Sequence, residues 1–257
     1  MTRTIDLNCD LGEAVDPAQR DVEARVLAHV TSVNIACGVH AGDPDLMRRT
    51  VQLALAHGVA IGAHPGLRDP DGMGRRERTL TEVEVENLIA YQVGALAGIC
   101  ALAGARLVHV KPHGALYAMA ARDRELADAV ARAVVAVDRR LILVGLAGSE
   151  LIAAGQAAGL VVAEEAFVDR AYQPDGSLVP RDLPGAVIHE EAPVLARAVS
   201  LARDGTVPSL DGPPVRVCAD TLCLHGDTPG ADRLVRAVRN ALTDAGIRVA
   251  RLSDVHA

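Results

Sequence analysis

The sequence has almost no aromatic residues: its 257 residues include no Trp, three Tyr and one Phe. It also has no excess of basic residues, because 33 acidic residues outnumber 26 basic ones and the formal net charge is −7. This acidic balance argues against a nucleic-acid-binding role. Half of the residues are hydrophobic, which is enough to bury a large core and excludes wholesale disorder. The length and the uninterrupted pattern predict one soluble domain over residues 1–257.

Cysteine pairs and export signals are also missing. The five cysteines include no C-x-x-C pair, so neither a disulfide framework nor a thiolate zinc cluster is indicated. The first ten residues lack the basic and apolar regions of a signal peptide, and we therefore expect a cytoplasmic protein with reduced thiols. Residues 88–105 carry no charge and place Gly94 and Gly98 at G-x-x-x-G spacing, but their Ala and Gly content favours a buried, closely packed helix over a membrane span.

Short apolar runs alternate with longer helical patterns along the whole chain. Continuous apolar runs are typical of parallel strands that are buried on both faces. About seven such units predict an α/β fold, a single-domain (β/α) barrel that is closed or nearly closed. The expected strands are 4–9, 32–37, 59–63, 106–110, 141–145, 160–166 and 216–224. The expected helices are 17–28, 44–57, 81–103, 123–137, 149–157, 191–203 and 231–245. Residues 169–184 combine charge, Pro and Gly with little periodicity and predict a lid-like loop.

Polar side chains gather just after the expected strands. Because the carboxyl ends of barrel strands open on one face, these segments are predicted to converge on one pocket. The segments are Asn8–Glu13, Asn34–Asp43, Gly62–Gly66, Lys111–Tyr117, Glu164–Tyr172 and His225–Gly230. Four histidines within them have a glycine within two residues, which is typical of tight turns beside a ligand: His40, His64, His113 and His225. The other five histidines, including His109, are interpreted as structural or solvated.

Lys111 is the only lysine, whereas arginine occurs 25 times. Arginine does not replace lysine where a compact ammonium group is needed, so this bias predicts a specific role for Lys111. Because Pro112 follows, we expect Lys111 to be extended and to point into the mouth of the pocket, where its substitution should leave the fold intact.

A metal site and a metal-free site both stay open at this stage. Asp10 with His40, His64, His113 or His225 could ligate a divalent ion, or the same groups could act as acid, base and hydrogen-bond donors. Of Glu164 and Glu165, which are adjacent on a strand, one must point inward and the other outward. The arginines Arg75, Arg76, Arg170 and Arg181 could bind a carboxylate or phosphate, and Tyr117, Phe167 and Tyr172 could form an aromatic wall.

Seven ordered motifs carry a resemblance that covers nearly the whole chain. The segments DLNCDLGE, NIACGVHAGDP, GAHPG, GMGRR, VKPHGALY, EAFVDRAY and HGDTPG resemble the LamB/YcsF family of 5-oxoprolinase A subunits. The resemblance implies a seven-stranded barrel similar to glycoside hydrolase and deacetylase folds. It further implies the ATP-dependent opening of 5-oxoproline to L-glutamate, together with companion subunits B and C; a homo-oligomer stays open.

Opening a lactam requires activation of the carbonyl, a water nucleophile and a proton for the leaving nitrogen. We hypothesise that Asp10 or Glu165 is the general base, that His113 or His225 is the acid, and that Lys111 stabilises the oxyanion or a phosphorylated imidate. The candidate substrate-binding residues are Asn8, Asn34, His40, His64, Arg75, Arg76, Tyr117, Asp169, Arg170, Tyr172, Arg181 and Asp227. Two rivals stay open: a metal-dependent amidohydrolase or deacetylase that needs no ATP, and a subunit that binds the lactam without catalysis.

Overall fold

Seven parallel strands form a closed barrel in the computed structural model, which describes residues 3–14, 16–224 and 230–255. The last barrel strand, β9, pairs with both β6 and β1 and so closes the ring. In order around the barrel the strands are β1 (Thr4–Leu11), β2 (Ser32–Ala36), β3 (Ala60–His64), β4 (His109–Val110), β5 (Ile142–Leu146), β6 (Val162–Phe167) and β9 (Thr221–Leu224). The predicted seven-stranded (β/α) barrel is confirmed.

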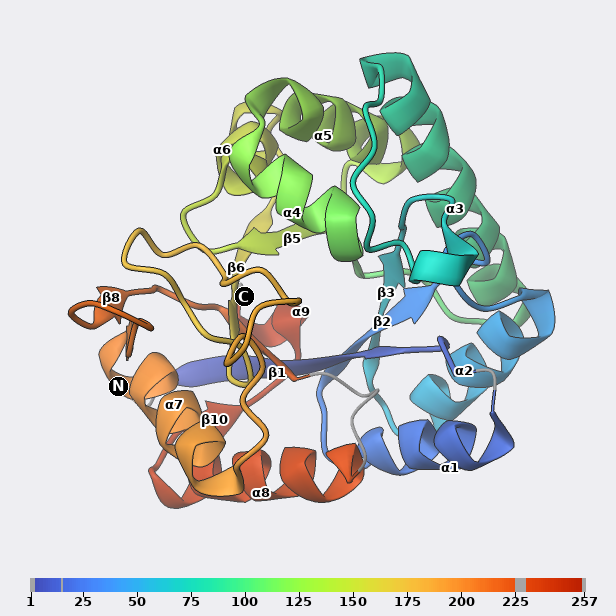
Figure 1. The fold of residues 1–257 in the computed structure, drawn as a ribbon. Coiled ribbons are helices and arrows are strands. Elements are labelled where there is room, and N and C mark those ends of the chain that lie inside the picture. Colours follow the sequence, from blue (N-terminus) through green and yellow to red (C-terminus); the bar gives the residue numbers. More distant parts are fainter. Residues whose placement is uncertain (1–2, 15, 225–229, 256–257) are drawn as a thin grey trace.

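Helices surround the barrel (Figure 1). Side-chain caps and an early proline define several helix starts; Asp43, for example, accepts a hydrogen bond from the Leu46 N–H ahead of Pro44. The helices are α1 (Pro17–Val26), α2 (Pro44–Ala56), α3 (Glu82–Leu102), α4 (Gly114–Arg122), α5 (Arg124–Asp138), α6 (Glu150–Ala157), α7 (Glu191–Asp204), α8 (Ala231–Asp244) and α9 (Leu252–Val255), with a 3-10 turn at Pro70–Gly72.

Strand β1 separates an apolar layer from a polar barrel interior. Its residues Leu7 and Cys9 belong to the hydrophobic core, whereas the alternating residues Asp6, Asn8 and Asp10 make hydrogen bonds across the barrel. Because side chains alternate between the two faces of a strand, the polar set shares the interior. The strand thus positions three polar groups at increasing height toward its carboxyl end.

One expected element was wrong, and some elements were not predicted. Residues 216–224 do not form one strand: β8 (Val215–Arg216) pairs antiparallel with β7 (Thr206–Val207) outside the barrel, and only β9 joins the ring. The Val217 N–H bonds to Gly205, which keeps the start of this segment beside α7. The sequence pattern did not reveal α4, because the polar motif that precedes it is typical of a loop, and a short strand β10 (Arg248–Val249) also pairs with β1.

Helix α3 is long and apolar enough to cross a membrane by length and composition, and a third of that stretch is buried. It packs against α5, α2 and β3, with Ile89 and Val93 on its buried side. The expectation that Gly94 and Gly98 permit close packing is wrong, because a Cβ atom at either position would meet nothing within 4 Å. The apolar stretch is therefore a barrel helix with one open face.

The loop after β6 is held by buried arginines. Arg170 donates hydrogen bonds to the Val179 and Ala186 carbonyls, and Arg197 on α7 donates to the Arg170 carbonyl. Tyr172 is fully buried and accepts a hydrogen bond from the Phe167 N–H. Hydrogen bonds from Arg170 and Arg197 thus fix the position of the loop in this structure. Closure of the loop over a ligand stays a prediction.

Candidate active site

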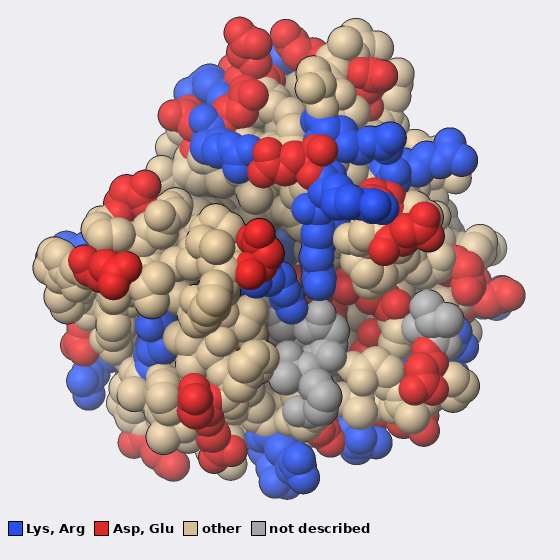
Figure 2. Space-filling model, viewed as in Figure 1, with Lys and Arg blue, Asp and Glu red and all other residues tan. Residues whose placement is uncertain are grey.

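A cavity of about 690 Å³ lies at the carboxyl ends of the barrel strands. Asp10, His64 and Lys111 come to it from the ends of β1, β3 and β4, and residues 178–182 of the loop cover one side. Arginines from several elements also line it, and Figure 2 shows basic side chains gathered near the centre of the face in view. The lining arginines are Arg75, Arg122, Arg170 and Arg181.

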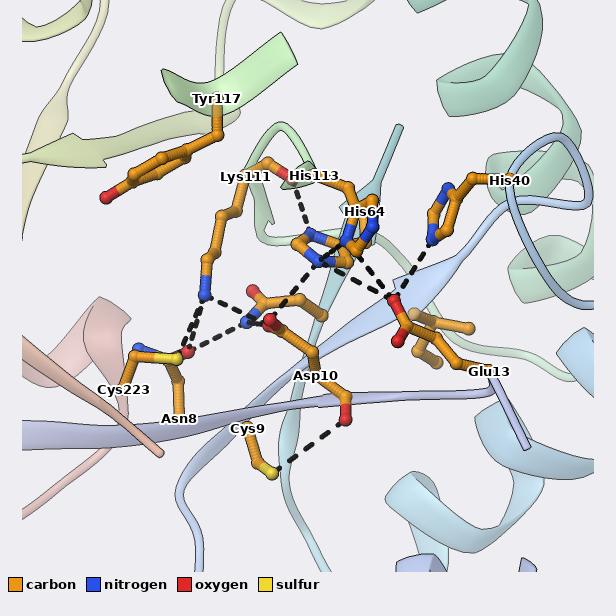
Figure 3. Close-up of polar contacts among 12 residues, drawn as sticks. Asn8, Cys9, Asp10, Glu13, His40, His64, Lys111, His113, Tyr117 and Cys223 are labelled. Carbon is orange, nitrogen blue, oxygen red and sulfur yellow. Dashed lines mark hydrogen bonds and ion pairs between the residues drawn. The ribbon is translucent and has the colours of Figure 1, made fainter. Parts of the chain in front are cut away.

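Lys111 is enclosed by acceptors at the inner end of the cavity (Figure 3). Its Nζ lies 3.0 Å from Asp10 Oδ1, 2.9 Å from Glu165 Oε1 and 3.1 Å from Cys223 Sγ. Asn8 Oδ1, at 3.4 Å, is a fourth acceptor for an ammonium group with three hydrogens. The group therefore has more acceptors than protons, and Lys111 itself borders the cavity.

The charge of Lys111 is maintained by its neighbours. Burial acts to lower its pKa, but the negative charges of Asp10 and Glu165 outweigh burial and hold the pKa well above its usual value. The side chain is only 2% exposed. Because Lys111 is buried, removing it would leave two carboxylates without their cation in a buried site, and we now predict that its substitution destabilises the fold.

Glu165 forms an ion pair with Lys111 but does not line the cavity. It is fully buried, and its other contacts are Asn8 Nδ2 at 3.0 Å and the Tyr117 hydroxyl at 2.8 Å. Glu164 on the same strand is only partly buried, which agrees with the expected inward and outward pair. Of the two candidate bases, only Asp10 faces the cavity.

Three histidines surround the carboxylate of Glu13 (Figure 3). His40 Nε2 is 3.1 Å and His113 Nδ1 is 3.3 Å from Glu13 Oε1, and the His64 Nε2 distance is 4.0 Å. The His40 and His113 rings stack with centroids 3.9 Å apart. Burial, with the nearby His64, lowers the pKa of His113 to about 3, and burial also lowers the pKa of His40.

The outer hydrogen bonds of two histidines fix their tautomers. His64 Nδ1 is 2.8 Å from the Lys111 carbonyl, and His113 Nε2 contacts the Met73 carbonyl at 2.6 Å. A carbonyl only accepts, so both of these nitrogens carry the hydrogen. The remaining nitrogens, His64 Nε2 and His113 Nδ1, then face each other at 3.0 Å with lone pairs. This arrangement is stable only with a proton or a metal cation between them.

Glu13 is a site residue that sequence reasoning missed. Its position after Gly12 is held by Glu23 on α1, whose carboxylate accepts hydrogen bonds from the Gly12 and Ala14 N–H groups. Glu13, His64 and His113 form a group that could hold a metal ion. The sequence had suggested Asp10, together with His40, His64, His113 or His225, and did not include Glu13. Glu13 is the last residue of the polar segment that contains Asp10, and this position in the segment could have identified it as a site residue.

Several predicted site residues lie beneath or beside the cavity and do not line it. Arg76 instead bonds to Asp69, and Arg170 braces the loop although it also borders the cavity. The other predicted residues that do not line it are Asn8, Asn34, His40, Glu165, Asp169 and Tyr172. His225 and Asp227 lie outside the described residues. The structure brings together Asp10, His64, Arg75, Lys111, His113, Tyr117 and Arg181 around the cavity.

Comparisons with known proteins agree over almost the full length. The LamB/YcsF family model matches residues 5–257. The 5-oxoprolinase A subunit of Methylococcus capsulatus is 54% identical over 252 residues, which are 98% of this chain and 97% of the relative. The protein of the same name from Heliobacterium modesticaldum is 56% identical over 245 residues, covering 95% and 96%.

Solved structures support the same architecture. The lactam utilization protein from Thermus thermophilus superposes with a TM-score of 0.88 at 45% identity, covering 96% of this chain and 99% of the other. A T48 deacetylase solved with substrate has a TM-score of 0.53 at 13% identity, covering 99% and 90%. At that identity the second likeness concerns the fold alone.

Proposed function

This chain belongs to the LamB/YcsF family, and on that premise we propose that it is the lactam-hydrolysing component of an ATP-dependent 5-oxoprolinase. The reaction is the opening of 5-oxoproline to L-glutamate, coupled to ATP hydrolysis in a cytoplasmic assembly with companion subunits B and C. Relatives that share more than half of the sequence are named as the A subunits of 5-oxoprolinases, which supports work in a multi-subunit complex.

The observation that carries the proposal is the buried contact of Lys111 with Asp10 at the inner end of the cavity. A lactam is an amide with a poor leaving nitrogen, so its opening needs stabilisation of negative charge on the carbonyl oxygen and a base for water. A charged donor in a water-poor site stabilises an oxyanion far better than it would in water. Lys111 supplies that donor.

Asp10 is the general base in this mechanism. Its Oδ1 is held by Lys111 and by the Asn34 amide, whereas Oδ2 is 3.3 Å from His64 Nε2 on the cavity side. Glu165 is assigned to fixing Lys111, because it does not reach the cavity. The proton held between His113 Nδ1 and His64 Nε2 would make this pair the acid toward the leaving nitrogen. His225, the other candidate for the acid, lies outside the described residues.

The substrate carboxylate is assigned to the arginines of the cavity. Arg181 and Arg75 line it, and guanidinium groups bind carboxylates through paired hydrogen bonds. Tyr117 and Phe167, whose rings meet edge to face at 5.9 Å, form the apolar wall for the ring carbons. Bound ATP would supply the phosphoryl group for the lactam oxygen, with ADP as the leaving group. Lys111 would stabilise the negative charge of the phosphorylated imidate, from which phosphate leaves after water has attacked.

A metal-dependent hydrolase without ATP is the second candidate, favoured by the facing nitrogens of His64 and His113. Glu13, His64 and His113 fit a divalent ion, because their ligand atoms lie within 4.8 Å of one another and border the cavity. The outer bonds to backbone carbonyls orient both imidazoles, as is usual for metal-ligating histidines. Such an ion would polarise the carbonyl and acidify water.

The deciding experiment measures glutamate formation from 5-oxoproline by this chain alone and by the complete assembly, each with and without ATP. We expect turnover only in the complete assembly with ATP, and its loss in Lys111→Met. Turnover by the chain alone without ATP, together with one tightly bound divalent ion per chain by elemental analysis, would support the metal hydrolase. Binding of 5-oxoproline with turnover that is insensitive to Lys111→Met would identify a carrier subunit.

A further inference from the structure

One row of the barrel interior joins four neighbouring strands. Strand pairing places Asp10, Asn34, Gly62 and His109 in register across β1, β2, β3 and β4. His109 Nε2 lies 2.7 Å from Asn34 Oδ1, and Asn34 Nδ2 lies 2.7 Å from Asp10 Oδ1. An imidazole on β4 therefore reaches across β3 to an amide on β2, which in turn holds the carboxylate on β1.

Gly62 makes this reach possible. A Cβ atom at position 62 would overlap the ring of His109 itself, so no other amino acid fits there while His109 keeps its place. A glycine in the interior of a strand weakens the strand and marks a close approach by another group. Here the approaching group is the imidazole of His109.

The direction of every hydrogen bond in the row follows from its acceptors. Asn34 Nδ2 faces two of them, Asp10 Oδ1 at 2.7 Å and Asn8 Oδ1 at 2.8 Å. Asn8 presents its oxygen because its own Nδ2 donates to Glu165 and Thr221. Asn34 Oδ1 is thus left to accept, and His109 Nε2 must be the donor.

We propose that His109 is a positioning residue: by donating its Nε2 hydrogen to Asn34, it fixes the orientation of the Asn34 amide that holds Asp10. His109 is 1% exposed, and burial together with the charge of Lys111 lowers its pKa to about 3, so it is neutral with one N–H. Its Nδ1 has no hydrogen-bond partner among the described residues. Asn34 is therefore the one described group to which this ring bonds.

The consequence concerns the proposed base, so this inference rests on the proposed function. Without the His109 donor, the Asn34 amide is held only on its Nδ2 side, by Asp10 and Asn8. An amide that has lost the donor at its oxygen can turn about its side chain and shift the Asp10 carboxylate away from Lys111. Substrate binding by the cavity arginines would persist, whereas the chemical step would slow.

The experiment compares His109→Leu, His109→Gln and Gly62→Ala in the complete assembly. His109→Leu should lower kcat for 5-oxoproline by about 10- to 100-fold, the range in which partners that orient a site residue contribute, with KM changed less than about threefold. His109→Gln, which keeps an N–H donor, should recover most of kcat. Gly62→Ala should match His109→Leu, but should cost no further activity in a His109→Ala background, where the clash is gone.

Gly155→Ala is the matched control. Its Cβ would crowd Val162 at 2.6 Å on the outer side of the barrel, so it should lower the melting temperature without changing kcat per folded molecule. A kcat in His109→Leu equal to the wild type, or a loss that His109→Gln does not relieve, would overturn the positioning role.

A second measurement does not depend on turnover. Long-range ¹H–¹⁵N spectra of the folded wild-type chain should show His109 as the neutral Nε2–H tautomer from pH 6 to 8. An Nδ1–H tautomer would overturn the inference even if the assembly hydrolyses 5-oxoproline. The expected tautomer in a wild-type assembly that lacks 5-oxoproline turnover would instead locate the failure in the proposed function.

Discussion

Lys111 occupies a place that suits an ammonium group and not a guanidinium group. Its Nζ sits among four acceptors at 2.9 to 3.4 Å, gathered around one point. Arginine spreads five donors over a planar fork and needs acceptors in that plane. The retention of a single lysine in a chain that otherwise uses arginine is explained by this geometry.

Lys111→Arg is therefore expected to lower kcat by about 10²- to 10³-fold in the complete assembly, almost as much as Lys111→Met. Lys111→Met should also lower the free energy of unfolding by about 3 to 5 kcal/mol, because Asp10 and Glu165 lose their buried partner. Steady-state kinetics and chemical denaturation measure the two effects. Arg140→Lys, at a side chain that is 86% exposed, is the control. Near-full turnover in Lys111→Arg would contradict the role.

Asp6 gives a pH-dependent contribution to stability. Burial, only partly offset by hydrogen bonds from Ser32, Thr221 and Thr31, raises its pKa from 3.8 to about 6. The folded chain thus binds a proton below pH 6 that the unfolded chain binds only near pH 4, so acidification through this window favours the folded state at this group.

The stability of the wild type relative to Asp6→Asn should therefore increase by up to about 3 kcal/mol as the pH falls from 7 to 4. Urea denaturation of both proteins across that range measures the difference, and other titrating groups cancel. A constant difference would show that Asp6 is neutral, or equally ionised, in both states.

Sequence reasoning located Lys111, Asp10, His64 and His113 because each directly follows a strand or ends one. It did not distinguish Asp10 from Glu165 as the cavity-facing carboxylate, since that depends on how far along its strand each residue lies. Glu13 and Glu23 were missed because their roles exist only once α1 packs beside the end of β1. Such contacts have no local signature in the chain.

Among the elements, α3 shows how composition alone misleads. One side of α3 is buried, and Ile89 on it is not exposed to solvent. The other side faces solvent but is also apolar, and Tyr91 on it is 68% exposed. Since both sides are apolar, periodicity does not distinguish a barrel helix from a membrane span.

Ile89→Ala is expected to lower the free energy of unfolding by about 2 to 5 kcal/mol, because it leaves a cavity beneath α3. Tyr91→Ala should change it by no more than about 0.5 kcal/mol, as for other surface positions. Thermal and urea unfolding of the purified chain test the pair. A large loss for Tyr91→Ala with little for Ile89→Ala would reverse the assignment of the two sides.

Two arginines of the loop after β6 have different roles, one in holding the loop and one at the cavity. Arg170 is committed to the Val179 and Ala186 carbonyls, whereas Arg181 lies on the cavity side of the same loop. The sequence suggested either arginine as the clamp for the substrate carboxylate. The backbone bonds of Arg170 now favour Arg181.

Arg181→Gln should raise KM for 5-oxoproline by about 10-fold or more, the loss expected for a charge-assisted hydrogen bond. It should leave KM for 2-pyrrolidinone, which has no carboxylate, nearly unchanged. Arg170→Gln should instead lower the melting temperature and affect both lactams alike. Equal effects of Arg181→Gln on the two substrates would exclude the clamp.

At the scale of the whole molecule, the alternation of strands and helices was sufficient to predict the barrel and its seven strands. The failures came where an element is short or where its partner is distant. Strand β4 has only two residues, and the polar residues that follow it belong to the site. The sequence of β8 resembles that of a barrel strand, but the Val217 N–H bonds to the Gly205 carbonyl outside the barrel. Pairing of this kind is decided by the assembled sheet and not by the residues of the strand.

Closure of the ring by β9 has a consequence for biosynthesis. Strand β1 leaves the ribosome before the other barrel strands, and Thr221, which donates to Asp6 across 215 residues, emerges only after all six of the preceding barrel strands. Until then a nascent sheet presents β1 and β6 as unpaired edges, the kind of surface that recruits other chains into aggregates. Newly made chains should therefore depend on chaperones during this interval, and a chain terminated before β9 should be insoluble even though it already contains Asp10, His64 and Lys111.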